Sequence, residues 1–507
     1  MRLSWWSSGA LVGLFACAGA GCFALDGCLF DTTGGGAGGG GAAAGGGGAG
    51  GTGAGGTGGG GGGTGGATGW ISGIPEDDGG LRVRYLDLAL GTGELIVAGA
   101  IESDGPASVA LGGACSVQAG NGLRPFIAFF DLEGNCLEAI ANVEWSAPAL
   151  EGLTMAVAKG KDPGEAYLVF SIANVSKLIH VVSHTANVIL VDCSSGYCRF
   201  NDVVFDGEET AFAVGGIVPG GDPCSDGMTA PALHKAFAVS LRATGRFPSD
   251  VDCAQQDLSG SLGTPGKVDH FLGRAAALPN RLVFSGYSAG TIGDGNEPCT
   301  GACLFYGVYG TAAGFEAASG LDLQPSASCA LPAVAAEGSS AWSLATSCED
   351  ANFIVMPSLF SLMGASSFNL VDQVTPSDAK ATADWVVGAG GARSLGAGHG
   401  SSVRWGFLAL EKSGNEGAPD LYYLIPNGAT SSTEGTAITG IAPTSDQALY
   451  FVGHFDASVV PSTLELERFA DSPANREIVL GPLELPACSS EPCTRPFIGR
   501  WQLPAPP

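Results

Sequence analysis

Short apolar segments recur along the chain, and each has a small residue at its sixth position. Seven of them occur between Glu94 and Phe455, separated by polar and glycine-rich stretches. Apolar runs of this length, bounded by turn-forming residues, predict buried β-strands. The segments are ELIVAGAI, AYLVFSIA, TAFAVGGI, RLVFSGYS, SAWSLATS, ADWVVGAG and ALYFVGHF, and their small residues are Gly99, Ser171, Gly215, Gly286, Ala345, Gly388 and Gly453.

Each segment has further strand signals on both sides. A short strand is predicted before it, as in residues 83–90 and 202–205. After it, apolar residues alternate, so that Phe237, Val239 and Leu241 lie on one face of a predicted strand. Glycines able to take a positive φ, which a tight hairpin needs, then mark turns at Gly134, Gly245 and Gly414.

Four strands repeated roughly every 40–70 residues, without an amphipathic helix, are typical of a β-propeller. We therefore predict an all-β fold over residues 70–507, a β-propeller with seven four-stranded blades. The small sixth residue is expected on the inner strands, because strands that converge on the axis leave little room for side chains.

The two ends of this region predict how the ring closes. The motif Arg-Pro-Phe-Ile occurs at residues 124–127 and again at 495–498, which places the second copy in the third strand of the last unit. A strand from residues 70–74 is expected to supply the missing fourth strand, since closed architectures avoid a free sheet edge.

The first residues predict export. Residues 9–16 form an apolar run too short for a membrane span, which needs ~20 residues, but long enough for a signal-peptide core. Residues 1–21 resemble a bacterial lipoprotein signal, in which a cysteine is lipidated after cleavage. Two lipidation sites remain open: Cys17 has Leu14 three positions before it, and Cys22 directly follows Gly21.

A tether is predicted between this signal and the propeller. Residues 34–69 contain only Gly, Ala and Thr, a composition that cannot bury enough apolar surface to offset its conformational entropy. We expect residues 22–69 to form a disordered spacer, whose glycine-rich part spans about 30–36 Å root-mean-square, with a taut limit of about 120 Å.

The composition restricts the function classes. The 507 residues include 22 basic and 49 acidic side chains, a formal net charge of −27, yet charged residues make up only 14%. Nucleic-acid binding relies on clustered Lys and Arg, so this balance argues against a nucleic-acid partner. The hydrophobic content of 45% is ample for a packed core.

The repeated units resemble those of bacterial seven-bladed β-propeller repeat proteins, which are exported and often lipid-anchored behind low-complexity tethers. The units at Ser171 and Ala345 depart from the pattern because they lack the glycine. The resemblance implies a binding or scaffold role.

Cysteine usage fits export, because an even number of cysteines follows the signal region. Pairing between chain neighbours is expected, although by analogy Cys299 or Cys303 is an alternative partner for Cys329. Soft-metal ligation by the closely spaced cysteines is the weaker alternative. The expected pairs are Cys115–Cys136, Cys193–Cys198, Cys224–Cys253, Cys299–Cys303, Cys329–Cys348 and Cys488–Cys493.

Two short motifs resemble enzyme signatures without meeting their requirements. Residues 286–290 (GYSAG) fit the G-x-S-x-G nucleophile elbow around Ser288, but a loop-like sequence follows where a helix is needed. Residues 261–268 lack the first glycine of a phosphate loop, and Val268 stands where Ser or Thr should hold magnesium. We therefore predict no catalytic residues.

Metal binding is not predicted either. His180 and His184 share one face if both lie on a strand, but no carboxylate separates them, and a satisfied or exposed pair is the preferred interpretation. The acidic clusters at residues 76–78, 206–209 and 294–297 lack the ligand spacing of a calcium loop. No cofactor is expected, with calcium at one of these clusters as the alternative.

The sequence thus favours a cell-envelope lipoprotein at the outer membrane or cell surface, anchored in the membrane by its lipid and monomeric. Its propeller is expected to act as a binding or scaffold module for a glycan, peptide or protein, because propeller loops converge at the channel mouth. The alternative is an exported hydrolase or lyase with its site at the propeller channel, but no His, Glu or Arg recurs in matching loops.

Overall fold

A computed structural model describes the chain from residue 69 to residue 505, with internal gaps. Every regular element of the described residues is a β-strand, in agreement with the all-β prediction. The described residues are 69–73, 81–112, 115–142, 145, 153–172, 175–193, 198–217, 235–244, 249, 251–257, 270–292, 297–310, 314–321, 332–338, 340–348, 355–361, 367–369, 373–393, 404–412, 420–427, 435–457, 462–468, 477–485 and 493–505.

Four sheets consist of four antiparallel strands each, paired in chain order. The first two are β8 (Thr154–Lys159), β9 (Ala166–Ile172), β10 (Val175–Val182) and β11 (Ala186–Asp192), and β12 (Cys198–Phe205), β13 (Thr210–Ile217), β14 (Lys235–Ala243) and β15 (Val251–Asp257). The next two are β16 (His270–Leu278), β17 (Arg281–Ile292), β18 (Glu297–Gly310) and β19 (Gly314–Leu321), and β20 (Ala333–Glu337), β21 (Ser340–Cys348), β22 (Val355–Ser361) and β23 (Ser367–Asn369).

The larger sheets contain the same four-stranded arrangement with additions. One comprises β24 (Gln373–Ala381), β25 (Trp385–Arg393), β26 (Arg404–Lys412) and β27 (Asp420–Asn427), extended by the hairpin β30 (Ser462–Arg468) and β31 (Glu477–Leu485). The other joins β2 (Arg82–Leu90), β3 (Glu94–Ser103), β6 (Gly122–Asp131) and β7 (Cys136–Ile140) to β28 (Thr436–Pro443), β29 (Ala448–Ala457), β32 (Cys493–Gln502) and β1 (Gly69–Gly73). A separate hairpin pairs β4 (Ala107–Gly112) with β5 (Cys115–Ala119).

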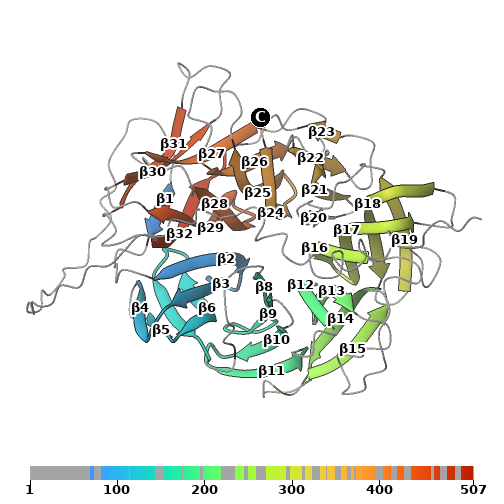
Figure 1. Ribbon diagram of the computed structural model, residues 1–507, viewed down its shortest axis with the longest axis horizontal. Coiled ribbons are helices and arrows are strands. Elements are labelled where there is room, and N and C mark those ends of the chain that lie inside the picture. The colour runs from blue at the N-terminus through green and yellow to red at the C-terminus, as the bar shows by residue number, and fades with distance from the viewer. Residues whose placement is uncertain are drawn as a thin grey trace, which may run out of the picture.

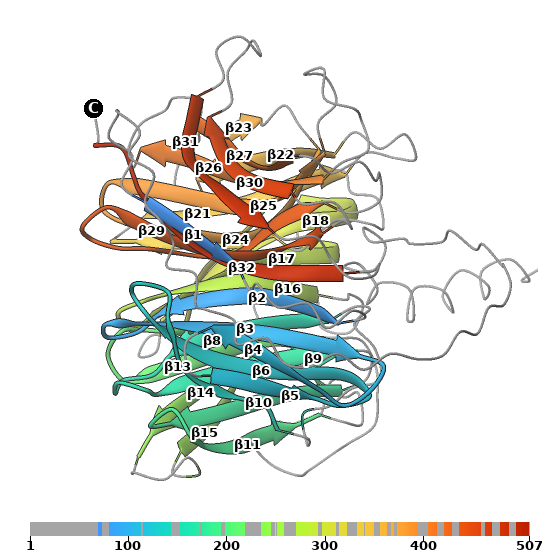
Figure 2. The same ribbon diagram turned by 90° about the vertical axis from the view of Figure 1, so that its left-hand side faces the viewer.

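The sheets stand around a common centre, as Figure 1 shows, and Figure 2 shows the same ring from the side. Their first strands lie innermost, and each contacts the first strand of the next sheet, while the last returns to β2. This radial arrangement of four-stranded antiparallel sheets is a β-propeller, as predicted. Each blade is named here by its inner strand: β2, β8, β12, β16, β20, β24 or β28.

The continuous apolar runs are explained by burial on both faces of a blade. In β3, Leu95 and Val97 pack toward the β28 blade, while Ile96 and Ala98 pack toward the β8 blade. Alternate side chains of a strand point to opposite faces, so a strand buried on both faces needs an apolar residue at every position. The hydrophobic core therefore lies between the blades.

The predicted strand around residue 70 closes the ring. β1 pairs antiparallel with β32, from Gly69 opposite Trp501 to Gly73 opposite Phe497, and so supplies the outer strand of the β28 blade. A side chain on Gly134, in the β6–β7 turn of the β2 blade, would collide with the Trp70 indole, so the two lie in close contact. β1 therefore holds the last blade to the first.

The position of the small sixth residues differs from the expectation. They lie on β3, β9, β13, β17, β21, β25 and β29, which are the second strands of their blades and not the inner ones. In four blades the inner strand has a bulge opposite this residue. Its main chain approaches closely, because a side chain on Gly215 would collide with the carbonyl oxygen of Arg199, and one on Gly453 with that of Ala437. Space for the neighbouring bulge, not crowding at the axis, explains the small residue there.

Candidate functional site

The inner strands carry buried charged residues at or next to their bulges. Asp87 in β2, Asp202 in β12 and Asp378 in β24 each follow a register shift in the pairing with the second strand. Arg274 of β16 lies within such a shift. The three carboxylates are 1–3% exposed, which is rare for Asp without partners.

Each of these carboxylates joins its own blade to the next. Asp87 Oδ2 accepts a hydrogen bond from the backbone amide of Val157 (2.8 Å), and Asp202 Oδ2 accepts one from that of Ala275 (2.7 Å). Asp378 Oδ2 does the same with the amide of Ile441 (3.0 Å). The repeated contact satisfies a buried amide on the next inner strand and fixes the distance between neighbouring blades.

Arg274 connects two of these carboxylates across the ring. Its Nη1 lies 3.3 Å from Asp202 Oδ1 and 3.5 Å from Asp87 Oδ2. Because β16 and β2 stand on opposite sides of the centre in Figure 1, the ion pair between Arg274 and Asp87 spans the ring. Lys380 Nζ lies 2.8 Å from Asp378 Oδ1 on the same strand. We call Asp87, Asp202, Asp378, Arg274 and Lys380 the axial cluster.

Burial dominates the electrostatics of the axial cluster. It raises the pKa of Asp87 to about 7; Arg274 and Lys380 oppose this rise, and the carboxylates of Asp378 and Asp202 add to it. Burial also raises the pKa of Asp202. Asp87 Oδ1 accepts no hydrogen bond within the described residues. The Asp87 carboxyl therefore exchanges a proton near neutral pH, whereas its other oxygen holds the β8 blade.

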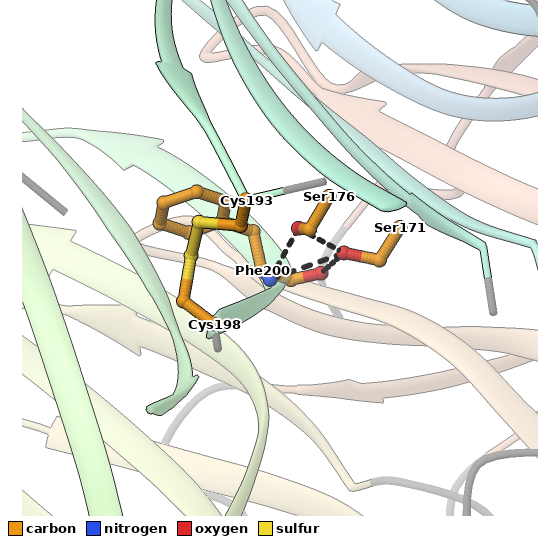
Figure 3. The surroundings of a disulfide bond; sticks show 5 residues. All are labelled: Ser171, Ser176, Cys193, Cys198 and Phe200. Atoms are coloured by element: carbon orange, nitrogen blue, oxygen red, sulfur yellow. Dashed lines mark hydrogen bonds between the residues drawn. A yellow bond between two sulfur atoms is a disulfide. The ribbon is translucent and has the colours of Figure 1, made fainter. Parts of the chain in front are cut away.

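Hydroxyl groups join three further pairs of blades, one of them through Ser285 and Ser343, whose Oγ atoms lie 3.3 Å apart between the β16 and β20 blades. Figure 3 shows Ser171 in β9 and Ser176 in β10 at the joint to β12, where both Oγ atoms accept the Phe200 amide (3.1 and 2.9 Å) and Ser171 Oγ donates to the Phe200 carbonyl (2.6 Å). Thr439 Oγ1 donates to the carbonyl of Tyr85 (2.8 Å) and so joins the last blade to the first. Ser171, which stands in the β8 blade where most units have glycine, thus links this blade to the β12 blade.

Two predicted disulfides are present in the described residues. Cys193 is bonded to Cys198 beside the joint in Figure 3, with Cα atoms 5.5 Å apart. Cys115 of β5 is bonded to Cys136 of β7, with Cα atoms 5.8 Å apart, and ties the inserted hairpin to the outer strand. Cys253 is also disulfide-bonded. Cys224, Cys329 and Cys488, and the side chains of Cys299, Cys303, Cys348 and Cys493, lie outside the description.

The two histidines do not act together. His180 lies in β10, is 1% exposed, and places Nε2 2.8 Å from Glu165 Oε1 while stacking on Tyr167. His184 lies beyond the end of β10 at a φ of 62°, with Nε2 2.6 Å from Glu94 Oε2. The assumption that both share a strand face was wrong because a turn intervenes. Among the described residues, no three His, Cys, Asp or Glu side chains are arranged to hold a metal ion.

The GYSAG motif lies within a strand. Residues 286–290 belong to β17, and Ser288 pairs with His270 on one side and Cys303 on the other. A nucleophile elbow requires a sharp strand-to-helix turn at the serine, which a paired strand does not provide. The phosphate-loop-like residues 261–268 lie outside the described residues.

The acidic turn at residues 206–209 is held by its own contacts. Asp206 Oδ1 accepts the amides of Glu208, Glu209 and Thr210, and Glu209 pairs with Lys161 and Arg242. The clusters at 76–78 and 294–296 lie outside the described residues. At the described acidic turn, the carboxylate nearest the backbone is already used as a turn cap.

Sequence reasoning missed the axial cluster. The available signal was an Asp directly before an apolar residue inside the upstream strand, present in three units as Asp87-Leu88, Asp202-Val203 and Asp378-Ala379. A buried carboxylate at a repeated strand position indicates a repeated contact, but the donor residues lie 63–73 positions further along the chain.

Comparisons with known proteins concern the fold. No family model matches the chain, and no curated protein sequence matches it. Among solved structures, it is similar to the β-propeller domain of the Trilobed protease from Pyrococcus furiosus, with 10% identity, a TM-score of 0.39, and coverage of 78% of this chain and 96% of that one. The phage phi92 endosialidase is similar as well, with 10% identity, a TM-score of 0.41, and coverage of 87% of this chain and 70% of that one. The Dos1 propeller has 11% identity, a TM-score of 0.37, and coverage of 86% of this chain and 95% of that one.

TM-scores this low say nothing about ligands or activity. The assignment of the fold therefore rests on the strand pairing described above. Within the described part of the chain, no helix has the length and hydropathy to span a bilayer.

Proposed function

We propose that this chain is an exported, lipid-anchored binding module whose ligand, a glycan, peptide or protein, is held by the loops at one end of a seven-bladed propeller. The inner-strand contacts, which run from β2 through β28 and back, support the count of seven. The apolar signal segment and the Cys17 and Cys22 positions support the anchor.

The observation that carries the binding proposal is an asymmetry between the two ends of the ring. In an antiparallel blade, connections from first to second and from third to fourth strand lie at one end, and all others lie at the opposite end. The connections from first to second and from third to fourth strand are short, for example residues 91–93, 206–209, 279–280 and 444–447. We call this side the turn end.

The opposite side, the loop-bearing end, receives the extra length of the chain. Connections there include 104–121 with the β4–β5 hairpin, 218–234, 394–403 and 458–492 with the β30–β31 hairpin. Long connections on a rigid scaffold are where binding residues are usually found.

The binding proposal is tested by melting curves of the mature chain with glycans, peptides and metal ions. A ligand at 100 times its dissociation constant stabilises by about 2.7 kcal/mol. The shift should vanish when residues 218–234 or 394–403 are replaced by short Gly-Ser linkers, and persist when Thr92 of the turn end is changed to Lys. A ligand-induced shift that only the Thr92 change removes contradicts the assignment.

A second candidate function is an exported hydrolase or lyase with its site in the channel. The raised pKa of Asp87, about 7, favours it, because a general acid works best near the operating pH. The test is hydrolysis of polysaccharide and peptide substrates by the wild type and by Asp87→Asn. Activity that Asp87→Asn abolishes without unfolding the domain would establish this alternative.

A further inference from the structure

The direction of β1 shows at which end of the propeller the predicted tether begins. β32 is the third strand of its blade and runs toward the turn end, where Leu503 donates its amide to the carbonyl of Gln447 (2.8 Å) in the β28–β29 turn. β1 is antiparallel to β32, and Gly69 lies opposite Trp501. The first residue of β1 therefore lies at the turn end.

The attachment point is also held firmly. Trp70 contacts the turn at Gly134 of the β2 blade, and a side chain on Gly69 would collide with Leu480 of β31. With the ladder to β32, β1 is held on three sides. The glycine-rich residues 34–68, which directly precede Gly69, thus leave from a fixed place on the domain.

We propose that the propeller is presented with its turn end toward the membrane and its loop-bearing end away from it, open to a partner from outside. This rests on the proposed lipid anchor. It deepens that proposal by assigning the accessible face, because tether and long connections leave the ring at opposite ends.

The length of the tether makes this orientation the favoured one. A globular domain of this size has a radius of gyration of about 22 Å, and so a diameter well above the tether's root-mean-square span of about 30–36 Å. Turning the domain over would require the tether to stretch around it to nearly twice that span. Stretching a flexible chain so far removes most of its conformations.

The test measures the height of both ends of one strand above a membrane. Thr92 and Asp104 are exposed and flank β3, Thr92 at the turn end and Asp104 at the loop-bearing end. They stand about 35–40 Å apart along the strand direction. A donor fluorophore is placed at either position through an unnatural amino acid, in the lipidated full chain on vesicles with an acceptor on the lipid headgroups.

We expect the energy-transfer efficiency from position 92 to be at least about twice that from position 104. Equal efficiencies, or a higher value from position 104, would overturn the orientation. A chain with the tether sequence duplicated serves as the control, and its two efficiencies should be lower and closer together.

A second experiment tests the orientation of the propeller independently of the proposed lipid anchor. The chain from residue 22, with an N-terminal hexahistidine tag, is bound to vesicles containing a nickel-chelating lipid, which attaches the tether without lipidation. Position 92 should again give the higher efficiency. Failure of the native chain to float with vesicles overturns the anchor, whereas equal efficiencies in the nickel-bound chain overturn the orientation alone.

Discussion

The carboxylate of Asp202 in β12 accepts the backbone amide of Ala275 in β16 over 2.7 Å, and thereby joins two neighbouring blades. The same contact recurs from Asp87 to Val157 and from Asp378 to Ile441. A hydrogen bond to a carboxylate is strong when both groups are buried, and burying a carboxylate without such a bond lowers stability. The rigidity of the ring therefore depends on a few polar contacts near its axis as well as on apolar packing between blades.

Removing Asp202 should destabilise the whole domain. Asp202→Ala leaves the Ala275 amide without its acceptor and Arg274 with Asp87 as its remaining close carboxylate, and breaking a buried pair in this way costs about 3–5 kcal/mol. Denaturant unfolding of the mature wild-type and variant chains measures this loss in the free energy of unfolding. The matched control is Asp420→Ala, which removes an exposed pair with Arg468 and should cost about 0–1 kcal/mol. Equal costs would contradict the role assigned to Asp202.

The ionisation of Asp87 should make stability fall as the pH rises. Its folded pKa, about 7, lies above the ordinary value of 3.8, so the folded state keeps a proton that the unfolded state has lost. The free energy of unfolding therefore declines between pH 3.8 and about 7, the range in which the folded state binds more protons.

The measurement compares wild type with Asp87→Asn at pH 5.5 and pH 8. The stability of the wild type relative to the variant should be greater at pH 5.5, because the amide of the variant does not ionise. A difference between the two chains that is independent of pH would show that Asp87 titrates as an ordinary surface carboxyl.

Trp70 should contribute to closure of the ring. Its indole contacts the turn at Gly134, and replacing this half-buried side chain by Ala should cost about 1–3 kcal/mol. Trp70→Phe keeps an aromatic ring at this contact and should cost less. Deletion of residues 69–73 should lower the melting temperature further, since it also removes the ladder to β32. An unchanged melting temperature after the deletion would refute closure by β1.

The glycines opposite the bulges should not tolerate a side chain. Gly215→Ala places a Cβ against the carbonyl of Arg199, and relieving that overlap requires a backbone shift that costs about 1–3 kcal/mol. Gly391→Ala is the control on another second strand, because its nearest neighbour would be an ordinary 3.9 Å away. Thermal melting of both variants tests the difference, and equal melting temperatures would remove the explanation given for the small residue.

Much of the fold was predictable because it depends on local patterns. Continuous apolar runs such as residues 94–101 required strands buried on both faces, and the repeat of Arg-Pro-Phe-Ile pointed to a closing strand near Trp70. The pairs Cys115–Cys136 and Cys193–Cys198 join chain neighbours, which is why spacing along the sequence was a sufficient guide.

Contacts between residues far apart in the chain depend on how the ring closes. Spacing alone did not reveal that Arg274 meets Asp87 across the ring, that the β30–β31 hairpin pairs with β27 of the preceding blade, or that His184 turns away from His180 to meet Glu94. These depend on which surfaces the closed ring brings together. Local hydrophobic periodicity determines strands, whereas polar contacts at the axis are determined by the geometry of closure.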